Sequence, residues 1–263
     1  MSTPMVSVIT VTYNNLEGVK KTLESVRSQT ARDFEWVVID GASSDGTQTY
    51  LAGVEAPGFR WISEKDGGIY NAMNKGIAIA SGKYAIFMNA GDQFASDQVI
   101  ADFVDAVGVD RPALVYGDAL EQGESGSFYK PARPPSQNAY VMFTHHQAIF
   151  YEMSILKAKG YDETYRFGSD WALTTRVLKD HPGSHLKIDK PICVFERGGV
   201  SQRDDHRKQI NHEHWRIYRE LGKLPLPTAA FFWLLKTQTN NVRRALPGLY
   251  DSIRYKKQLS SHD

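Results

Sequence analysis

The feature that most constrains the fold is an alternation of strand-like and helix-like segments over the first 120 residues. Residues 6–12 are rich in β-branched residues and stop at a Tyr-Asn-Asn turn, and residues 16–29 place Val19, Leu23 and Val26 at helical spacing. Residues 34–39 form an almost unbroken apolar run, as in a strand covered on both faces. Strands that alternate with helices indicate right-handed crossovers, so we predict an α/β chain with a mostly parallel sheet.

The pattern continues with a strand at 59–62, a helix at 70–80 and a strand at 84–88. Further along, residues 148–151 and 186–195 predict strands and residues 170–179 a helix, whereas the turn-rich residues 121–127 and 130–137 predict loops. Ligands of such sheets bind beyond the carboxyl ends of the strands. The polar turns at 12–15, 40–47 and 89–92 lie there, so we expect the site at that edge.

Composition limits the class of protein. A chain of 263 residues with net charge +1 has no basic excess of the kind that nucleic-acid binders carry, so we expect no nucleic-acid partner. The single cysteine, Cys193, excludes an intramolecular disulfide and a Cys-rich zinc site, and its apolar neighbours indicate a buried residue. No window of 18 apolar residues and no signal segment is present, so we expect a cytoplasmic protein.

Two acidic turns are candidate sites. Asp40 follows a buried strand directly, so we expect its carboxylate to project into the crevice and accept hydrogen bonds from a nucleobase or ribose. Asp45 fits either a ligand contact or the cap of the following helix. In Asn89-Ala90-Gly91-Asp92, the Asp92 carboxylate fits a divalent cation beside a diphosphate, or a tight turn that uses Gly91. Neither turn carries the glycine pattern of a dinucleotide fold or a P-loop.

Several motifs together resemble the family 2 glycosyltransferases, which are inverting enzymes of the GT-A fold. The resemblance spans roughly residues 5–202, and a narrower similarity points to colanic acid and related exopolysaccharide transferases. The motifs are VSVITVTYN (6–14), DGASSDGT (40–47), SEKDGGIYNAMNKG (63–76), GKYAIFMNAGD (82–92), HQAIF (146–150), SDWAL (169–173) and GGVS (198–201).

The resemblance implies a GT-A-like, Rossmann-like three-layer α/β/α fold with a helical C-terminal extension. It implies a glycosyltransferase domain over 1–222, with a nucleotide-sugar half (1–120) and an acceptor half (121–222). The residues that it assigns to a UDP- or GDP-linked donor sugar are Thr12, Tyr13, Asn14, Asp40, Ser43, Asp45, Asp66, Asn74, Lys75, Asn89 and Ala90. The residues that it assigns to the diphosphate or the acceptor are His146, Gln147, Trp171 and Ser201.

The resemblance also implies the chemistry. Asp170 matches the base that takes a proton from the acceptor hydroxyl in a single displacement, although an acid there also fits a helix cap. Asp92 is the expected ligand of Mg²⁺ or Mn²⁺, with Asn89 and Gly91 standing where the family usually has acidic residues. His145 and His146 do not form a zinc pair if they lie on a strand, because neighbours there point to opposite faces.

The C-terminal residues 223–263 combine the aromatic run 231–235 with basic residues and form a predicted amphipathic tail. These basic residues are Lys236, Arg243, Arg244, Arg254, Lys256 and Lys257. They fit contact with an anionic membrane surface and a lipid-linked saccharide acceptor, and the run 231–235 fits packing on the catalytic domain equally well. The rival functions are a sugar nucleotidyltransferase and a non-catalytic partner that binds sugar nucleotides.

Overall fold

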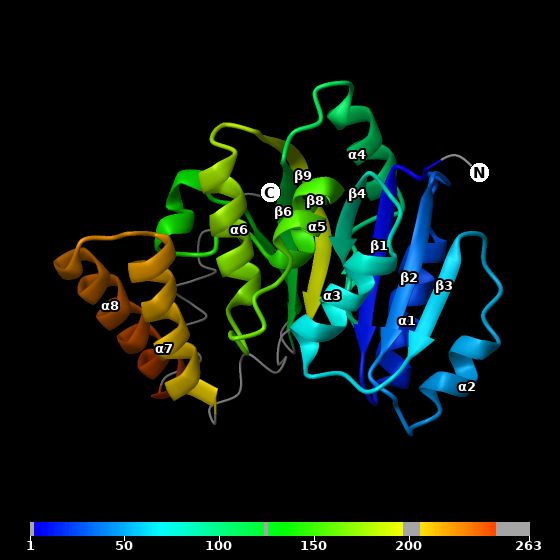
Figure 1. Cartoon of the computed structure of the whole chain (residues 1–263), viewed down its shortest axis with the longest axis horizontal. Helices are drawn as coiled ribbons and strands as arrows, with labels where there is room; N and C mark the ends of the chain where they lie inside the picture. Colours follow the sequence, from blue (N-terminus) through cyan, green and yellow to red (C-terminus); the bar gives the residue numbers. More distant parts are fainter. Residues whose placement is uncertain (1–2, 124–125, 197–205, 246–263) are drawn as a thin grey trace.

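The computed structural model describes residues 3–123, 126–196 and 206–245. Within these residues nine strands form one sheet in the order β3-β2-β1-β4-β8-β6-β9-β5, with β7 paired to β6 (Figure 1). The strands are β1 (Val6–Thr12), β2 (Phe34–Asp40), β3 (Phe59–Ser63), β4 (Tyr84–Phe87), β5 (Gln93–Phe94), β6 (Leu114–Gly123), β7 (Gly126–Lys130), β8 (Ile149–Glu152) and β9 (His185–Glu196). The helices are α1 (Leu16–Arg27), α2 (Thr47–Ala52), α3 (Ile69–Ile79), α4 (Val99–Val107), α5 (Met153–Lys159), α6 (Ser169–Asp180), α7 (Arg207–Arg216) and α8 (Leu226–Ala245).

The first half of the sheet is parallel and brings the predicted turns together. β1 pairs in parallel with β2 and β4, and its last residue, Thr12, lies opposite Asp40. Beyond β4 the sheet is mixed, because β8 runs antiparallel to both β4 and β6. β6 and β9 pair in parallel again, so the predicted parallel pairing is complete from β1 to β4 and alternates with antiparallel pairs beyond it.

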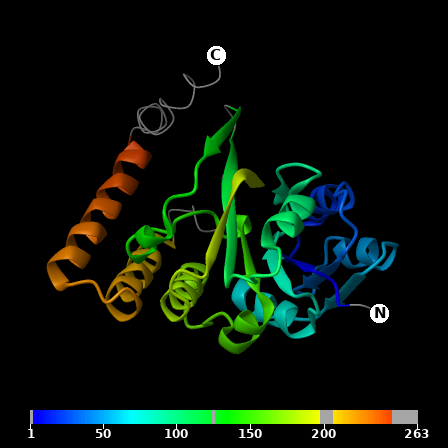
Figure 2. The ribbon, with the colours of Figure 1, turned by 90° about the horizontal axis from the view of Figure 1, so that it is seen from above.

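Helices cover both faces of the sheet, as predicted for a three-layer α/β/α fold. One hydrophobic core packs α1, α2 and α4 on one face, and the other packs α3, α5 and α6 on the opposite face (Figures 1 and 2). The predicted apolar face of the helix is confirmed, because Val19, Leu23 and Val26 of α1 are all buried. Between these two layers, residues at the carboxyl ends of β1 and β4 line an open cavity.

The prediction of a loop at 121–127 is wrong for the residues of this range that the structure describes. β6 continues to Gly123 and pairs antiparallel with β7, forming a hairpin that projects from the sheet (Figure 2). The polar residue Glu121 stays in a strand because its carboxylate is paired with Lys130 at 3.2 Å and His145 at 3.0 Å. Turn composition alone did not reveal that tertiary pairing.

The C-terminal helices pack against α6 through the first part of α8. Ala229 of α8 is fully buried, and Phe232 stacks on Tyr140 with ring centroids 4.4 Å apart. The opposite side of α8 exposes more than half of Phe231, Leu234 and Leu235. Among the described helices none is long and apolar enough to cross a bilayer.

Three of the six predicted basic residues of this region lie within the described part of the chain. Lys236 is described and faces the interior, beside Trp171. Arg243 and Arg244 fall in the last turn of α8, where side chains are not described. Arg254, Lys256 and Lys257 lie outside the described residues.

Candidate active site

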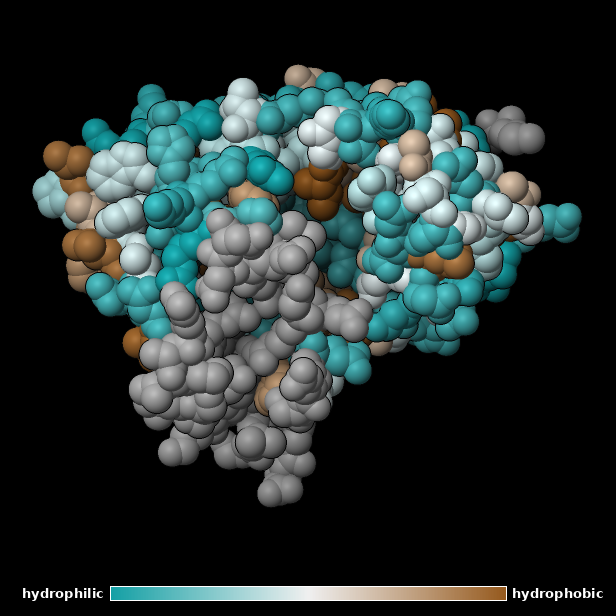
Figure 3. Space-filling model, turned by 90° about the horizontal axis from the view of Figure 1, so that it is seen from below, coloured by the Kyte–Doolittle hydropathy of each residue, from teal (hydrophilic) through white to brown (hydrophobic). Residues whose placement is uncertain are grey.

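A large cavity opens at the carboxyl ends of β1 and β4, where the two halves of the sheet meet. Its volume is about 1510 Å³, and it is lined by the start of α1, the start of α3, the turn after β4, the β6–β7 hairpin and the segment before α6. Figure 3 looks onto this edge and shows the hollow near the middle of the molecule. Six Asp and Glu side chains line it, against the cations Lys21, Lys130 and Arg166. A diphosphate bound here therefore needs additional positive charge.

The end of β1 presents polar and aromatic groups to the cavity. The Thr12 hydroxyl is buried and has no hydrogen-bond partner, which leaves it available to a ligand. The Tyr13 ring is 67% exposed at the cavity wall. Asn15, which our sequence reading did not select, caps α1 through Gly18 N–H and donates to the Ala90 carbonyl at 3.0 Å.

Asp40 does not project into the cavity, contrary to our expectation. It is fully buried, and its carboxylate accepts bonds from Ser63 Oγ at 2.6 Å, from Ser43 N–H at 3.0 Å and from the Ser43 hydroxyl. Asn14 binds the same loop, since its N–H donates to Ser43 Oγ at 2.7 Å and its Oδ1 accepts from Ser44 N–H. Asp40, Ser43 and Asn14 therefore build the loop after β2 and do not line the cavity.

Asp45 is not the N-cap that we weighed, since Gly46 is the N-cap of α2, but its side chain binds the first residues of two helices. Its carboxylate accepts from Leu16 N–H at 2.9 Å, at the start of α1, and from the Thr47 hydroxyl and N–H, at the start of α2. The Thr47 hydrogen bond lowers the pKa of Asp45. Two helix starts are thus joined by one exposed carboxylate.

Of the three site residues predicted in the segment 63–76, one lines the cavity and the other two make structural contacts. Asp66 lines the cavity and accepts from Gly68 N–H at 2.9 Å. Asn74 bonds the backbone of Tyr161 at 2.8 and 3.0 Å, and the Lys75 ammonium is held by the Lys65 carbonyl and Glu64, each at 2.8 Å. Asn74 and Lys75, both assigned to the donor by the resemblance, are not among the cavity-lining residues.

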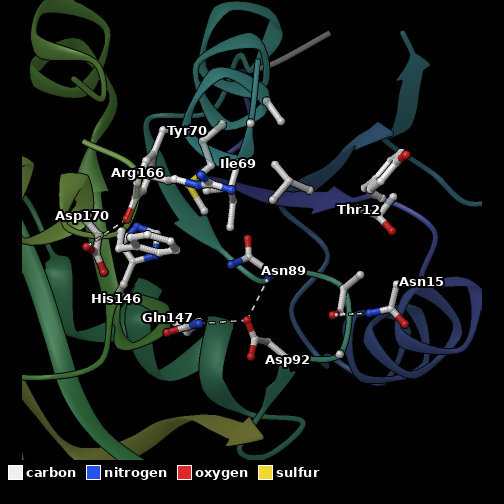
Figure 4. A pocket seen from close by; sticks show the side chains of 18 of the residues that line it. Thr12, Asn15, Ile69, Tyr70, Asn89, Asp92, His146, Gln147, Arg166 and Asp170 are labelled. Atoms are coloured by element: carbon white, nitrogen blue, oxygen red, sulfur yellow. Dashed lines mark hydrogen bonds between the residues drawn. The ribbon is translucent and has the colours of Figure 1, made fainter. Parts of the chain in front are cut away.

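The turn after β4 forms the cavity floor (Figure 4). Gly91 adopts a φ of 109°, which favours glycine, and the buried Asp92 accepts from Asn89 N–H at 3.2 Å and Gln147 Nε2 at 3.0 Å. The tight turn that we weighed is thus present, but a short strand follows it and Asp92 caps no helix. Ala90 also lines the cavity.

The same turn offers oxygen ligands for a hard cation. Asn89 Oδ1 is buried without a hydrogen-bond partner, one turn from the Asp92 carboxylate. Mg²⁺ commonly takes one or two protein oxygens and completes its shell with phosphate oxygens and water. Within the described residues no group of three or more His, Cys, Asp or Glu is arranged to hold a metal, so the fit depends on this amide–carboxylate pair.

His146 lies in the cavity wall as a neutral, packed ring. It begins a short 3-10 turn (His146–Ala148), not a strand as we had assumed when discounting a zinc pair. Its Nε2 lies 2.5 Å from the Tyr161 hydroxyl and its ring stacks on Phe87. Burial lowers the pKa of His146 to about 3, so it supplies no positive charge to a diphosphate at neutral pH.

Asp170 lies across the cavity from Thr12 (Figure 4). Its Oδ1 accepts from Trp171 N–H at 2.8 Å and from the Tyr70 hydroxyl at 3.3 Å. The N-cap of α6 is Gly168, so Asp170 is not the cap that we considered as an alternative. Burial raises the pKa of Asp170, while these two hydrogen bonds and the charge of Lys236 oppose the shift.

Trp171 points away from the cavity, contrary to our prediction. Its indole N–H donates to the Asn138 carbonyl at 2.7 Å, and its ring packs in the core between α6 and α8. Lys236 lies 4.7 Å from the centre of that ring and 3.3 Å from His214 Nε2. Burial lowers the pKa of Lys236 to about 8. Ser201 lies outside the described residues.

Arg166 is the main cavity residue that our sequence reading missed. Its side chain extends into the cavity above Asn89 (Figure 4). The available signal was a basic residue four positions before Asp170, in the loop directly preceding the SDWAL motif.

Comparison with known proteins agrees with this architecture. The chain is 36% identical over 207 residues to an uncharacterized glycosyltransferase of Mycobacterium tuberculosis, covering 76% of this chain and 78% of that protein. Staphylococcus aureus TarS (residues 1–349) in complex with UDP-GlcNAc superposes with a TM-score of 0.65 at 17% identity, over 82% of this chain and 71% of TarS. The mannosyltransferase PcManGT of Pyrobaculum calidifontis, in complex with GDP-Man and Mn²⁺, gives 0.62 at 17% identity, over 87% and 68%.

The two structural likenesses show the GT-A type of fold alone, since their sequence identity is low. The family model of glycosyl transferase family 2 matches residues 7–181, which hold all the cavity-lining residues except Phe195 of β9 and Gln209 of α7. This match decides between the enzyme classes weighed above in favour of a glycosyltransferase. The narrower similarity to colanic acid transferases stays a prediction. The chain belongs to glycosyl transferase family 2.

Proposed function

We propose that the cavity binds a nucleoside-diphosphate sugar and transfers the sugar to an acceptor hydroxyl with inversion. The observation that carries this proposal is the placement of Asp170 across one cavity from two unpartnered buried polar atoms, Thr12 Oγ1 and Asn89 Oδ1. Groups of this kind are satisfied when a polar ligand occupies the space between them. A base on the opposite wall then faces the acceptor.

On the donor side, the Tyr13 ring offers a stacking surface for the nucleobase, and Thr12 and Asp66 offer polar contacts. Asp40, Ser43 and Asn14 support this wall from behind. Complexes of the structural neighbours with UDP-GlcNAc and GDP-Man support a UDP- or GDP-linked donor.

The diphosphate belongs over the cavity floor. Asp92 and Asn89 would hold Mg²⁺ or Mn²⁺, and the Mn²⁺ in the PcManGT complex supports that choice. The bound cation supplies positive charge to the departing diphosphate. Arg166 extends over the same floor and adds a second positive charge that does not depend on a metal.

Asp170 acts on the acceptor. Its Oδ1 is held by Trp171 N–H and Tyr70, so the carboxylate is oriented before the acceptor arrives. It takes the hydroxyl proton as the acceptor oxygen bonds to the anomeric carbon and the bond to the diphosphate breaks. One such displacement inverts the anomeric configuration.

We further propose a lipid-linked saccharide acceptor, met at the inner face of the plasma membrane. Support comes from the outward side of α8, where Phe231, Leu234 and Leu235 are each exposed by more than half. A Leu234→Ser/Leu235→Ser variant should sediment less with anionic phosphatidylglycerol vesicles, while Val109→Ser, at an apolar residue 94% exposed elsewhere, should not. Equal vesicle binding by both variants would contradict membrane contact through α8.

The function itself is tested by incubating the protein with a saccharide acceptor, Mn²⁺ and UDP- or GDP-linked hexoses, including UDP-GlcNAc and GDP-mannose. Release of nucleoside diphosphate by the wild type, lost in Asp170→Asn, is expected. Product analysis should show an inverted anomeric centre. A product with retained configuration would contradict the single displacement, and a wild type that binds none of these donors would contradict the donor assignment.

A further inference from the structure

Glu213 of α7 is a buried carboxylate that holds the backbone just before the predicted base. It is only 2% exposed. Its Oε1 accepts from Arg166 N–H, and its Oε2 accepts from the N–H groups of Phe167 and Gly168, all at 2.9 Å. Gln209 Nε2 donates to Oε1 at 3.1 Å. One side chain thus satisfies three consecutive backbone donors.

These three donors belong to the segment that presents both cavity groups of this wall. Arg166 enters the cavity, Gly168 is the N-cap of α6, and Asp170 lies in the first turn of that helix. The Gly168 cap has no side chain of its own to hold the helix start. A Cβ at Gly168 would lie 3.2 Å from Ile217 and 3.5 Å from Glu213 Oε2, so the segment fits closely against α7 and the turn after it.

The chemistry of a carboxylate suits this task better than other side chains. An ionised carboxylate accepts several hydrogen bonds, whereas an amide of the same shape offers one acceptor oxygen and places donors where backbone N–H groups already point. Burying a charge opposes folding unless such bonds satisfy it, and apolar packing would hold a loop without that penalty. A buried Glu213 therefore indicates a need for defined loop geometry.

We infer that Glu213 is a positioning residue, which fixes the Arg166–Gly168 backbone and thereby the orientation of the Asp170 carboxylate. This inference rests on the proposed role of Asp170 as base. Glu213 lies beyond residue 181, where the family match ends, so it assigns to the C-terminal helices a part in catalysis in addition to any membrane contact.

The test compares Glu213→Gln with Glu220→Gln, a carboxylate-to-amide change at an exposed position of the same C-terminal segment. With a donor that the wild type turns over, Glu213→Gln should lower kcat by about 10- to 100-fold, the scale expected from misplacing a catalytic group. The Kd for the nucleoside diphosphate should change by a smaller factor than kcat, because only the Arg166 contact is affected, and amide exchange at 166–168 should become faster. Glu220→Gln should change none of these.

A double-mutant cycle separates positioning from general damage. In an Asp170→Asn background, Glu213→Gln should cause a smaller loss of rate than in the wild type, because only the part that acts through Arg166 remains. The same fold-loss in both backgrounds, an unchanged kcat, or an equal fall in donor affinity would overturn the inference. Glu213→Asp, one methylene shorter, serves if Glu213→Gln does not fold, and unfolding of both would assign Glu213 to stability alone. Full activity of Asp170→Asn would instead refute the base assignment.

Discussion

The loop after β2 and the turn after β4 lie at the same edge of the sheet but use their polar residues in opposite ways. In the loop, the Asp40 and Asp45 carboxylates are taken up by Ser43, Ser63, Thr47 and the backbone of α1. In the turn, Asn89 Oδ1 has no protein partner and Asp92 lines the cavity. Acidic motifs at strand ends therefore divide into residues that build the wall and residues that face the ligand.

Asp170 belongs with the residues that face the ligand, and its substitution should give the largest loss of transfer rate. Asp170→Asn should lower transfer by about 10²–10⁴-fold, the usual contribution of a general base, and leave nucleotide affinity unchanged. Asn keeps the shape and can still accept the Trp171 N–H bond. Rates are followed as nucleoside diphosphate release, with the melting temperature as control. Near-wild-type transfer would place the base elsewhere, with Asp66 the next candidate.

A substitution of Asp40 tests whether the residues of the loop after β2 build the wall. Asp40→Ala strands the donors of Ser43 and Ser63 in a buried place, so it should lower the free energy of unfolding by about 1–3 kcal/mol. Denaturant titration measures this change. We expect weaker nucleotide binding as a consequence of the loosened loop. Unchanged stability together with lost nucleotide binding would instead make Asp40 a direct ligand contact, and the comparison drawn above would fail.

Thr12 is the matched case for a residue that faces the ligand, since its substitution should affect nucleotide affinity and not stability. Thr12→Val removes a buried hydroxyl that has no protein partner, so stability should stay the same or rise. Nucleotide affinity should fall by about 0.5–1.5 kcal/mol, the net value of one hydrogen bond. Calorimetry with UDP and GDP measures the affinity. A loss of stability without a loss of affinity would show that Thr12 belongs to the wall-building group.

The pH dependence of the transfer rate tests the protonation states of Asp170 and His146 in the cavity. Burial raises the pKa of Asp170, and the base acts only when deprotonated, so transfer should fall on acidification from a pH above about 4, the ordinary value for Asp. His146, with its pKa lowered to about 3 by burial, stays neutral and should add no step near pH 6.5. A step near pH 6.5 that disappears in His146→Gln would contradict this view of His146.

The sequence predicted which segments form the edge of the site but not where each side chain points. Hydrophobic periodicity located the strands before Thr12, Asp40 and Asn89, because strand ends follow from local patterns. We expected Asp40 to project into the crevice, but Ser43 and Ser63 hold its carboxylate inside the loop. The resemblance assigned Trp171 to the diphosphate or acceptor, whereas its ring packs between α6 and α8. Arg166 and Glu213 escaped notice because their roles arise from contacts between α6 and α7 that no local pattern records.

The most direct test of the central claim is calorimetry of UDP and GDP, with and without Mn²⁺, on the wild type, Asp170→Asn and Asp92→Asn. The account predicts that the wild type and Asp170→Asn bind the preferred nucleotide equally and that Mn²⁺ strengthens both. Asp92→Asn should keep its metal-free affinity and lose most of the enhancement by Mn²⁺. The contradicting result is weaker nucleotide binding by Asp170→Asn together with a full Mn²⁺ enhancement in Asp92→Asn. It would mean that Asp92 does not hold the cation and that Asp170 contacts the donor and does not act on the acceptor alone.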